Sequence, residues 1–451
     1  MAATFGVPLA LVTSELSSAY PVNGGYSIWV SEAFGTFWGL QESYWSWVSG
    51  VVDNALYPLL TYRAICLGFG YNPDKSYYFA GFVFRVAIAL VYSAPGLFLL
   101  RPIGDGLAIF FIIIMVPFLI LTVYAPASNP VELSTLFHSE EDASWGGGWR
   151  DLLTVLYWNF SGIDSASTSA GEVIRPGYHY PRGLLACVFI ILITYMVPLL
   201  AVTIVNKPPY ESWEDGSFAS IARAQGGRWL ADLVAIAGII GNAGMHIAEM
   251  FEDAWQLHGM AEVNLVPRIF RYRHPYFQTP WACITIQIVI ISLLQAFDFQ
   301  VIVCIDNFFS VIGVLLELLA FVYLRYSKPD MARPFKIPLS NTMLTAVLAP
   351  VFSLGVIVVV ASLTGSLVSL CINIGGLLIG VLGTLVAMYR YEDLRYTPKD
   401  GHSELIRTMA DVVAEDQKQP LSPENSSITN TPKGSSIFLR SAAEASSSNA
   451  E

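Results

Sequence analysis

The stretch WRDLLTVLYWNFSGIDSASTSAGEVIRPGYHYPR, residues 149–182, decides how the rest of the chain is interpreted. It begins as an apolar run from Leu152 to Trp158 and is then interrupted by polar residues and one glycine, Gly162. Irregular backbone at membrane depth is tolerated only where protein buries it or where it lines a cavity. We therefore expect a broken helix over residues 159–169, beside a cavity.

The composition is that of a protein that crosses a membrane many times. The chain has 451 residues, of which 54% are hydrophobic and 13% charged, whereas soluble domains carry about 25% charged residues. Together with 22 Tyr, 26 Phe and 11 Trp, these values predict an all-α polytopic membrane protein with the lipid bilayer as its surroundings. No basic run is present, so nothing in the sequence indicates a nucleic-acid partner.

About eleven apolar segments approach or reach the ~20 residues that a helix needs to cross the bilayer. They cover 3–20, 36–66, 77–100, 103–124, 150–170, 182–205, 229–257, 280–297, 299–325, 342–364 and 366–390. The stretch PVNGGYSIWVSEAFG at 21–35 is too polar to span, so we expect a re-entrant or interfacial piece there. These segments predict a transmembrane domain over 1–391, followed by a tail over 392–451 whose Ser, Asn and Pro content predicts disorder.

The charges of the loops predict the orientation in the membrane. Arg and Lys gather in the loops 171–182, 258–279 and 326–340, whereas the loop 125–149 holds four acidic residues and no Lys or Arg. Cytoplasmic loops carry an excess of Lys and Arg, so we expect the basic loops and the C-terminus in the cytoplasm.

Ionisable and polar residues inside the predicted spans form the candidate site, because such residues are costly in the bilayer. Carboxylates without fixed cationic partners suit a cationic substrate, which then supplies the counter-charge. Protonation is the competing solution, and it makes Glu249 and Asp53 candidates for proton coupling. The candidates within the spans are Asp53, Asn54, Tyr57, Asp164, Glu249 and Asp306.

Three more acidic residues and one aromatic residue of these spans need separate treatment. Glu252 and Asp253 lie toward the end of their span, where we expect interfacial solvation. Glu317 lies three turns after Asp306, and it either binds a neighbouring helix or acts in the site. Trp158 is the strongest aromatic candidate beside the break, because ammonium groups bind well over indole faces.

No catalytic or metal-binding motif is present, so we expect neither an enzyme nor a cofactor or metal site. The sequence lacks GxSxG, HExxH and Walker-type patterns. The five Cys show no CxxC spacing and the six His are scattered. Single buried thiols are the simplest interpretation, although Cys66 is a candidate for a bridge to an accessory subunit.

Several stretches together resemble one known family. They are PVNGGYSIWVSEAFGTFWG, WVSGVVDNALYP, WNFSGIDSASTSAGEVIRPGYHYPRGL, AEMFEDAWQLHGMAEVNLVP and DNFFSVIGVLLELLAFVYLRYSKPDMARPFKIPL, in the family's order over most of residues 5–391. The chain is similar to the amino acid–polyamine–organocation (APC) superfamily of permeases. Within it, the chain resembles the branch of polyamine-uptake and L-type amino acid transporter-like proteins.

The resemblance implies a LeuT-like fold, with two inverted five-helix repeats, two C-terminal helices and a substrate site at the midplane. An acidic residue at Glu249 favours polyamines within the family. The family's first helix is not recognised in the chain, so we also carry the expectation of an inactive truncated copy. The resemblance places in the site Trp158, Asn159, Ser161, Gly162 and Asp164 from the sixth helix, Asp53, Asn54 and Tyr57 from the third, Glu249 from the eighth and Asp306 from the tenth.

The leading hypothesis is a secondary active transporter that takes up polyamines such as putrescine or spermidine by proton symport. The alternative is a neutral or cationic amino acid permease or exchanger. We expect a multi-pass protein of the plasma membrane, with a small cationic substrate and protons as its partners.

Overall fold

The structure is a computed structural model that describes residues 1–22, 24–69, 78–98, 103–137, 148–205, 207–209, 213, 217–262 and 266–390. Within these ranges the chain is helical and contains no strand, which confirms the all-α membrane fold. The tail predicted over 392–451 lies outside the described residues.

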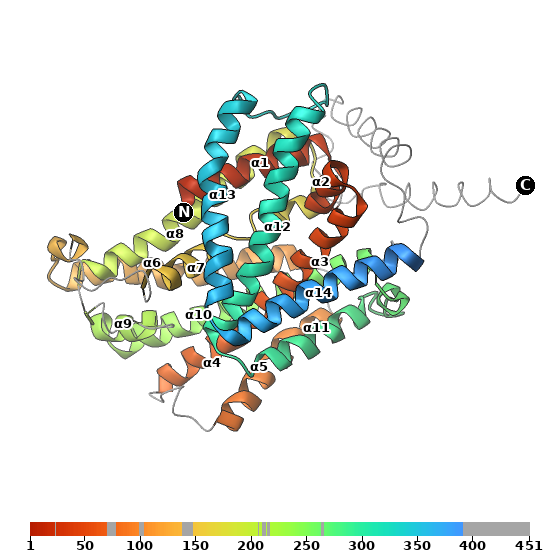
Figure 1. The fold of residues 1–451 in the computed structure, drawn as a ribbon. Coiled ribbons are helices and arrows are strands. Elements are labelled where there is room, and N and C mark those ends of the chain that lie inside the picture. Colours follow the sequence, from red (N-terminus) through yellow and green to blue (C-terminus); the bar gives the residue numbers. More distant parts are fainter. Residues whose placement is uncertain are drawn as a thin grey trace, which may run out of the picture. The chain divides into compact units, whose positions relative to one another are not determined.

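The helices follow one another along the chain as drawn in Figure 1. The first group is α1 (Val7–Ala19), α2 (Gly25–Phe34), α3 (Thr36–Asp53), α4 (Leu56–Phe69), α5 (Tyr78–Phe98) and α6 (Ile103–Ser128). The second group is α7 (Arg150–Trp158), α8 (Pro176–Thr203), α9 (Ser217–Gly226), α10 (Arg228–Glu262), α11 (Trp281–Leu294), α12 (Phe299–Ser327), α13 (Asn341–Thr364) and α14 (Leu367–Arg390). Short turns of π- or 3-10 helix occur at η1 (Ala2–Gly6), η3 (Leu133–Phe137), η5 (Ser165–Glu172) and η7 (Arg268–Arg271).

Seven of the described helices are long and apolar enough to cross a membrane as single pieces. The other predicted spans are shorter or divided: 3–20 and 280–297 contain α1 and α11, 36–66 divides into α3 and α4, and 150–170 breaks after α7. The predicted re-entrant piece at 21–35 is the short helix α2. The seven are Phe79–Leu97, Phe111–Ser128, Pro176–Thr203, Arg228–Ala261, Phe299–Ser327, Asn341–Thr364 and Leu367–Arg390.

Pro58 explains the division between α3 and α4. A proline inside a helix lacks an N–H and its ring clashes with the carbonyl four residues earlier, which here belongs to Asn54. Side-chain donors reach this carbonyl and the next one: His246 Nδ1 lies 3.1 Å from the Asn54 oxygen, and Gln295 Nε2 donates to the Ala55 oxygen at 2.9 Å. Hydrogen bonds from α10 and from the residue that follows α11 therefore satisfy the carbonyl groups at the break.

The second break follows α7 and lies where the sequence predicts it. The Asn159 amide side chain donates to the Val155 carbonyl at 2.8 Å, and the Ser161 hydroxyl donates to the Trp158 carbonyl at 2.8 Å. Such side chains offer the backbone an alternative to helical hydrogen bonds. Gly162 then adopts a φ of 78°, which glycine reaches without strain. The break between α7 and η5 is consistent with the broken sixth helix that a LeuT-like fold implies.

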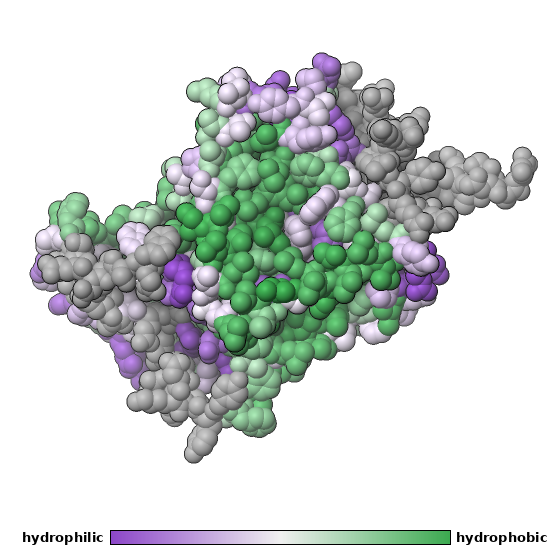
Figure 2. Space-filling model, in the orientation of Figure 1, coloured by the Kyte–Doolittle hydropathy of each residue, from purple (hydrophilic) through white to green (hydrophobic). Residues whose placement is uncertain are grey.

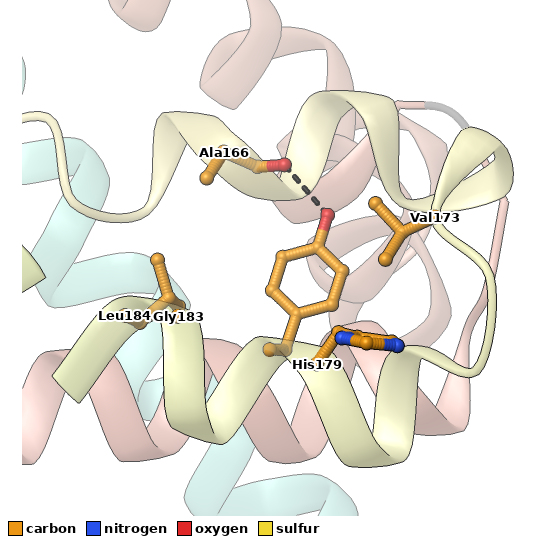
Figure 3. A pocket seen from close by; sticks show the side chains of 6 residues that line it. Ala166, Val173, His179, Gly183 and Leu184 are labelled. Atoms are coloured by element: carbon orange, nitrogen blue, oxygen red, sulfur yellow. Dashed lines mark hydrogen bonds between the residues drawn. The ribbon is translucent and has the colours of Figure 1, made fainter. Parts of the chain in front are cut away.

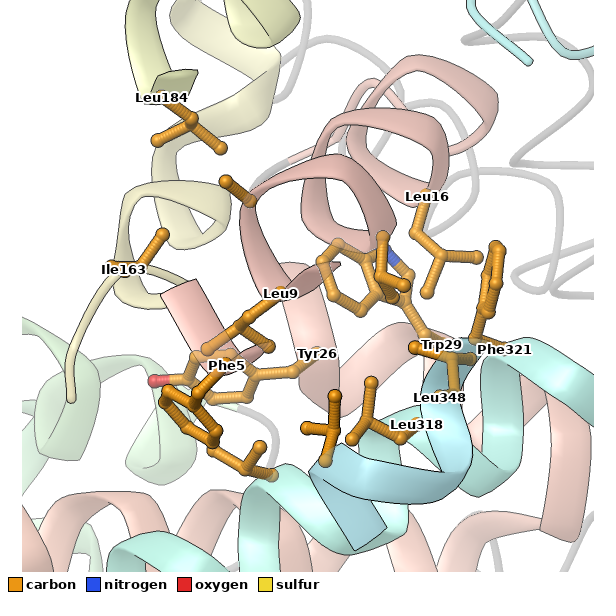
Figure 4. Packing of buried hydrophobic residues seen from close by; sticks show 14 of the residues in the cluster. Phe5, Leu9, Leu16, Tyr26, Trp29, Ile163, Leu184, Leu318, Phe321 and Leu348 are labelled. Atoms are coloured by element: carbon orange, nitrogen blue, oxygen red, sulfur yellow. The ribbon is translucent and has the colours of Figure 1, made fainter. Parts of the chain in front are cut away.

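Helix α12 lies at the centre of the packing, against α3, α2, α13 and α14. Figure 4 shows Phe5 and Leu9, from the start of the chain, close to Leu318 of α12 and Leu348 of α13. In lipid the surrounding chains are as apolar as leucine, so close packing and polar contacts hold helices together. The side chains of α12 thus have protein on most sides.

Apolar side chains also form the outer face of the helix bundle. Figure 2 shows them gathered over α13 and α14. Large exposed apolar residues there include Val356 and Val360 of α13 and Leu378 and Leu382 of α14. A soluble monomer rarely exposes a continuous apolar patch of this kind, so we infer that this face contacts lipid.

A buried ion cluster joins α1 to the end of α12 and the loop after it. The Glu15 carboxylate lies 2.6 Å from Arg325 Nη2 and 3.1 Å from Arg333 Nε, and it accepts the Ile337 backbone N–H at 2.9 Å. Arg325 also donates to the Ile337 carbonyl at 3.1 Å. Burial lowers the pKa of Arg333, and its attraction to Glu15 opposes that shift. The loop 328–340 is thereby fixed against α1.

We expect Glu15→Gln to destabilise the protein strongly. The change leaves two guanidinium groups without their carboxylate, and breaking a buried pair in this way costs about 3–5 kcal/mol. Thermal unfolding of the purified chain in detergent measures the loss. Glu132→Gln is the matched control, because Glu132 is exposed beside η3. Equal unfolding temperatures for the two variants would contradict the structural role of Glu15.

Candidate functional site

A cavity of about 120 Å³ lies between α3, α10, α12 and the break after α7. Among the described residues that line it there is no Lys, Arg or His. Serine and tyrosine hydroxyls and the amide of Gln256 supply its other polar groups. Its acidic residues are Glu42 and Asp53 from α3, Asp164 from the break, Glu249, Glu252 and Asp253 from α10, and Asp306 and Glu317 from α12.

Asp53 is held from two sides. Trp158 Nε1 donates to Asp53 Oδ1 at 2.6 Å. The Tyr57 hydroxyl lies 3.1 Å from Asp53 Oδ2 and 2.5 Å from Glu249 Oε1. A phenol has a single hydrogen, so it donates to one of these carboxyl groups at a time. The second contact then requires a proton on that carboxyl group. Asp53, Tyr57 and Glu249 thus form one hydrogen-bonded group.

Two further carboxylates are oriented by neutral donors. Asn54 Nδ2 donates to Asp253 Oδ2 at 3.2 Å, and Ser49 Oγ donates to Asp306 Oδ1 at 2.5 Å. Gly50 makes the first contact possible, because a Cβ atom at this position would collide with the Asp253 carboxylate. The outer walls of the cavity are thus built from close contacts between α3, α10 and α12.

Glu42, Asp164 and Glu317 lie together at the other end of the cavity. One oxygen of each has no hydrogen-bond partner among the described residues. Asp164 and Glu317 face each other closely enough to interact through their side chains, and Glu42 lies beside Gly313 of α12. Unpaired buried carboxylates are unfavourable, so a cation or a proton bound at this end would stabilise them.

The structure places the predicted residues in two layers. Trp158, Tyr57 and Asn54 lie behind the lining and orient the carboxylates, and Asn159 is turned to the backbone of α7. The predicted residues in the lining itself are Asp53, Ser161, Gly162, Asp164, Glu249 and Asp306.

Sequence reasoning missed several residues of the cavity. Glu42 was not recognised, although it lies between the polar residues Gln41 and Ser43 inside an apolar segment. The interfacial solvation expected for Asp253 is wrong, because this side chain is only 5% exposed and is bonded to Asn54. Glu252 is exposed, yet it lines the same cavity. Only the packing of α10 against α3 reveals which acids face inward.

His246 is a further polar group that the sequence did not single out. It is fully buried, with Nδ1 near the Asn54 carbonyl and Nε2 3.0 Å from the Ser93 hydroxyl. Its ring contacts Tyr57 edge-on. Because it supports both the helix break and Tyr57, we assign it to positioning of the site.

A second hollow of about 250 Å³ has a different character. It is lined by Ala166, Val173, His179, Tyr180, Gly183 and Leu184. Figure 3 shows Leu184 and Val173 facing it, and the Tyr180 hydroxyl donates to the Ala166 carbonyl at 2.7 Å. It contains no carboxylate. Within the described part of the chain no His, Cys, Asp or Glu residues are grouped to hold a metal ion. The acidic cavity is therefore the candidate site.

The known proteins to which this chain is similar are described as permeases and transporters. The profile of the family described as amino acid permease matches residues 1–386. A probable polyamine transporter of Arabidopsis thaliana is 36% identical over 362 residues, which cover 79% of this chain and 73% of the relative. A polyamine transporter of Oryza sativa subsp. japonica is 36% identical over 371 residues, 81% of this chain and 67% of the relative. A vacuolar cationic amino acid transporter of A. thaliana is 25% identical over 178 residues, 39% of this chain and 30% of the relative.

The acidic lining predicts charge-selective access to the cavity. With Ser161→Cys, which introduces a thiol into the lining, a cationic methanethiosulfonate reagent should react about tenfold faster than an anionic one, because the carboxylates concentrate cations. The comparison is made in a background without the native cysteines. Ser134→Cys, at an exposed position, should show little preference. Equal rates for both reagents at residue 161 would contradict an acidic cavity.

Proposed function

Since this chain belongs to the amino acid permease family, we propose that it is a proton-coupled secondary active transporter that takes up polyamines such as putrescine and spermidine. It is an integral, multi-pass membrane protein of a family of transporters. The identity of the substrate, the coupling to protons and the membrane in which the protein lies are proposals.

The observation that carries the proposal is the accumulation of carboxylates around one cavity without a basic residue in its described lining. Negative charges in a low-dielectric interior need a counter-charge, and removal of one partner of a buried pair is costly. A polyamine supplies several ammonium groups on an apolar chain, so it matches the negative charge of the cavity. Two relatives similar over most of the chain are named polyamine transporters.

An amino acid substrate fits the cavity less well. Its α-carboxylate would enter a site whose described lining contains eight acidic side chains and no Lys or Arg. Like charges placed together are unfavourable. A cationic amino acid permease remains the second candidate, because a vacuolar cationic amino acid transporter is similar to part of the chain.

Within the proposed site, the residues have different tasks. Asp53, Glu249 and Asp306 bind ammonium groups, and Ser161, Gly162 and Asp164 complete the wall at the break. Trp158 and Asn54 orient the carboxylates with their N–H groups, and Asn159 stabilises the end of α7. Rocking of one helical repeat against the other then exposes the cavity to each side of the membrane in turn.

Proton coupling rests on the shared hydrogen of Tyr57. In the empty site, a proton on Asp53 or Glu249 allows Tyr57 to keep both of its contacts. An arriving ammonium group supplies the counter-charge instead. Competition between proton and substrate for one carboxylate pair is a physical basis for coupling their movements. We propose the plasma membrane as the location, with the basic loops and the C-terminus in the cytoplasm.

Uptake of labelled spermidine into cells that express the chain tests the substrate. Glu249→Gln should lower the initial rate at subsaturating spermidine by at least about tenfold, as expected when a charge-assisted hydrogen bond is lost. Glu132→Gln should leave the rate unchanged. Arginine and leucine, added in excess, should compete poorly. Strong competition by arginine with weak competition by putrescine would favour the cationic amino acid permease instead.

Proteoliposomes test the coupling. An imposed proton gradient, acidic outside, should accelerate spermidine accumulation by the purified chain, and a protonophore should abolish the acceleration. Tyr57→Phe removes the shared hydrogen and should weaken the response to the gradient more than it weakens spermidine binding. Accumulation that is indifferent to the gradient would refute proton coupling without refuting transport.

A further inference from the structure

The acidic residues of α3 and α12 repeat at the same interval. Glu42 and Asp53 are eleven residues apart on α3, and Asp306 and Glu317 are eleven residues apart on α12. Eleven residues are about three helical turns, so the members of each pair share one helix face and are separated by about 16 Å along the axis.

The two helices run in opposite directions, so the pairs meet at both ends. Ser49, one turn before Asp53, donates to Asp306. Gly313, one turn before Glu317, lies beside the Glu42 carboxylate. Asp53 and Asp306 thus form one tier of the cavity. Glu42 and Glu317 form a second tier, which Asp164 joins from the break.

The second tier has unsatisfied bonding capacity. Glu42 and Glu317 are each 1% exposed and Asp164 is 8% exposed, and one oxygen of each has no partner among the described residues. In the first tier, by contrast, Trp158, Tyr57 and Ser49 donate hydrogen bonds to Asp53 and Asp306. A buried carboxylate oxygen that lines a cavity without a protein donor indicates a ligand that brings the donor.

We propose that Glu42, Asp164 and Glu317 form a second ammonium subsite, so that the cavity selects polyamines by length. The inference rests on the proposed function. An extended chain with C–C and C–N bonds of ordinary length places the terminal nitrogens about 16 Å apart in spermine, about 11 Å in spermidine and about 6 Å in putrescine. Spermine reaches both tiers, spermidine reaches them with the help of the flexible glutamates, and putrescine occupies one tier.

Acids on α10 extend from the first tier toward the second. Glu249 is close to Asp53, Asp253 is bonded to Asn54, and Glu252 interacts with Ser165 and Asp164. These positions are one turn apart or less on the same helix. Asp253 and Glu252 suit the internal amines of a polyamine whose ends lie in the two tiers, so the cavity matches a line of positive charges rather than a single one.

The test measures displacement of labelled spermidine from the purified full chain. We expect wild-type affinity to fall in the order spermine, spermidine, putrescine. The diamine 1,12-diaminododecane has the length of spermine without its internal amines, and it should bind more tightly than dodecylamine, which has one ammonium group on the same apolar chain. If 1,12-diaminododecane binds no more tightly than dodecylamine, the proposal is overturned. This comparison needs no variant.

Variants on two helices locate the subsite. Glu317→Gln and Glu42→Gln should each lower the affinity for spermine and for 1,12-diaminododecane by about tenfold to a hundredfold. The affinity for putrescine should fall by less than about threefold. Glu132→Gln should change none of these affinities, and thermal unfolding verifies that each variant folds. An equal loss for spermine and putrescine would overturn the length selection. A wild-type chain that binds no polyamine at all would refute the proposed function instead.

Discussion

Eight carboxylates around one small cavity impose the constraint on which the site depends. In a low-dielectric interior such charges cannot all remain uncompensated. Neutral donors from Trp158, Tyr57 and Ser49 satisfy individual oxygens without adding positive charge. The remaining compensation must come from protons or from a bound cation. In the proposed transporter, the same arrangement binds protons when no substrate is bound and favours cations as substrates.

The break between α3 and α4 increases this demand at Asp53. Pro58 ends the helix, and Asp53 is its last residue. The C-terminal end of a helix carries partial negative charge and favours cations, so an aspartate there is in an unfavourable field. His246 and Gln295 satisfy two carbonyls at this break with neutral donors, which supply no cation to Asp53. A cation that binds beside Asp53 interacts favourably with both the carboxylate and the helix end.

The sequence predicted what depends on composition and on local pattern. Apolar segments, the polar break after Trp158 and the acids in mid-span were all accessible, because each is costly in a bilayer wherever it lies. The proline that divides 36–66 was visible too, but the division was not predicted. Glu42, Asp253 and the open oxygen of Glu317 could not be assigned, because the choice between lipid, helix contact and cavity depends on the rotation of each helix against its neighbours. Glu15 was predicted neither as buried nor as paired, since Arg325 and Arg333 are more than 300 residues away.

Those distant pairs also explain why the cavity keeps its negative charge. The fixed cations of α12 and the loop after it include Arg325, Lys328 and Arg333, and they bind Glu15 and Glu32. Arg325 lies about two turns beyond Glu317 on the same helix, yet its guanidinium points to Glu15 rather than into the cavity. Lysine and arginine side chains are long enough to neutralise nearby acids if they are not already engaged. The ion cluster at the end of α12 thus holds these cations away from the carboxylates that we propose as the substrate site.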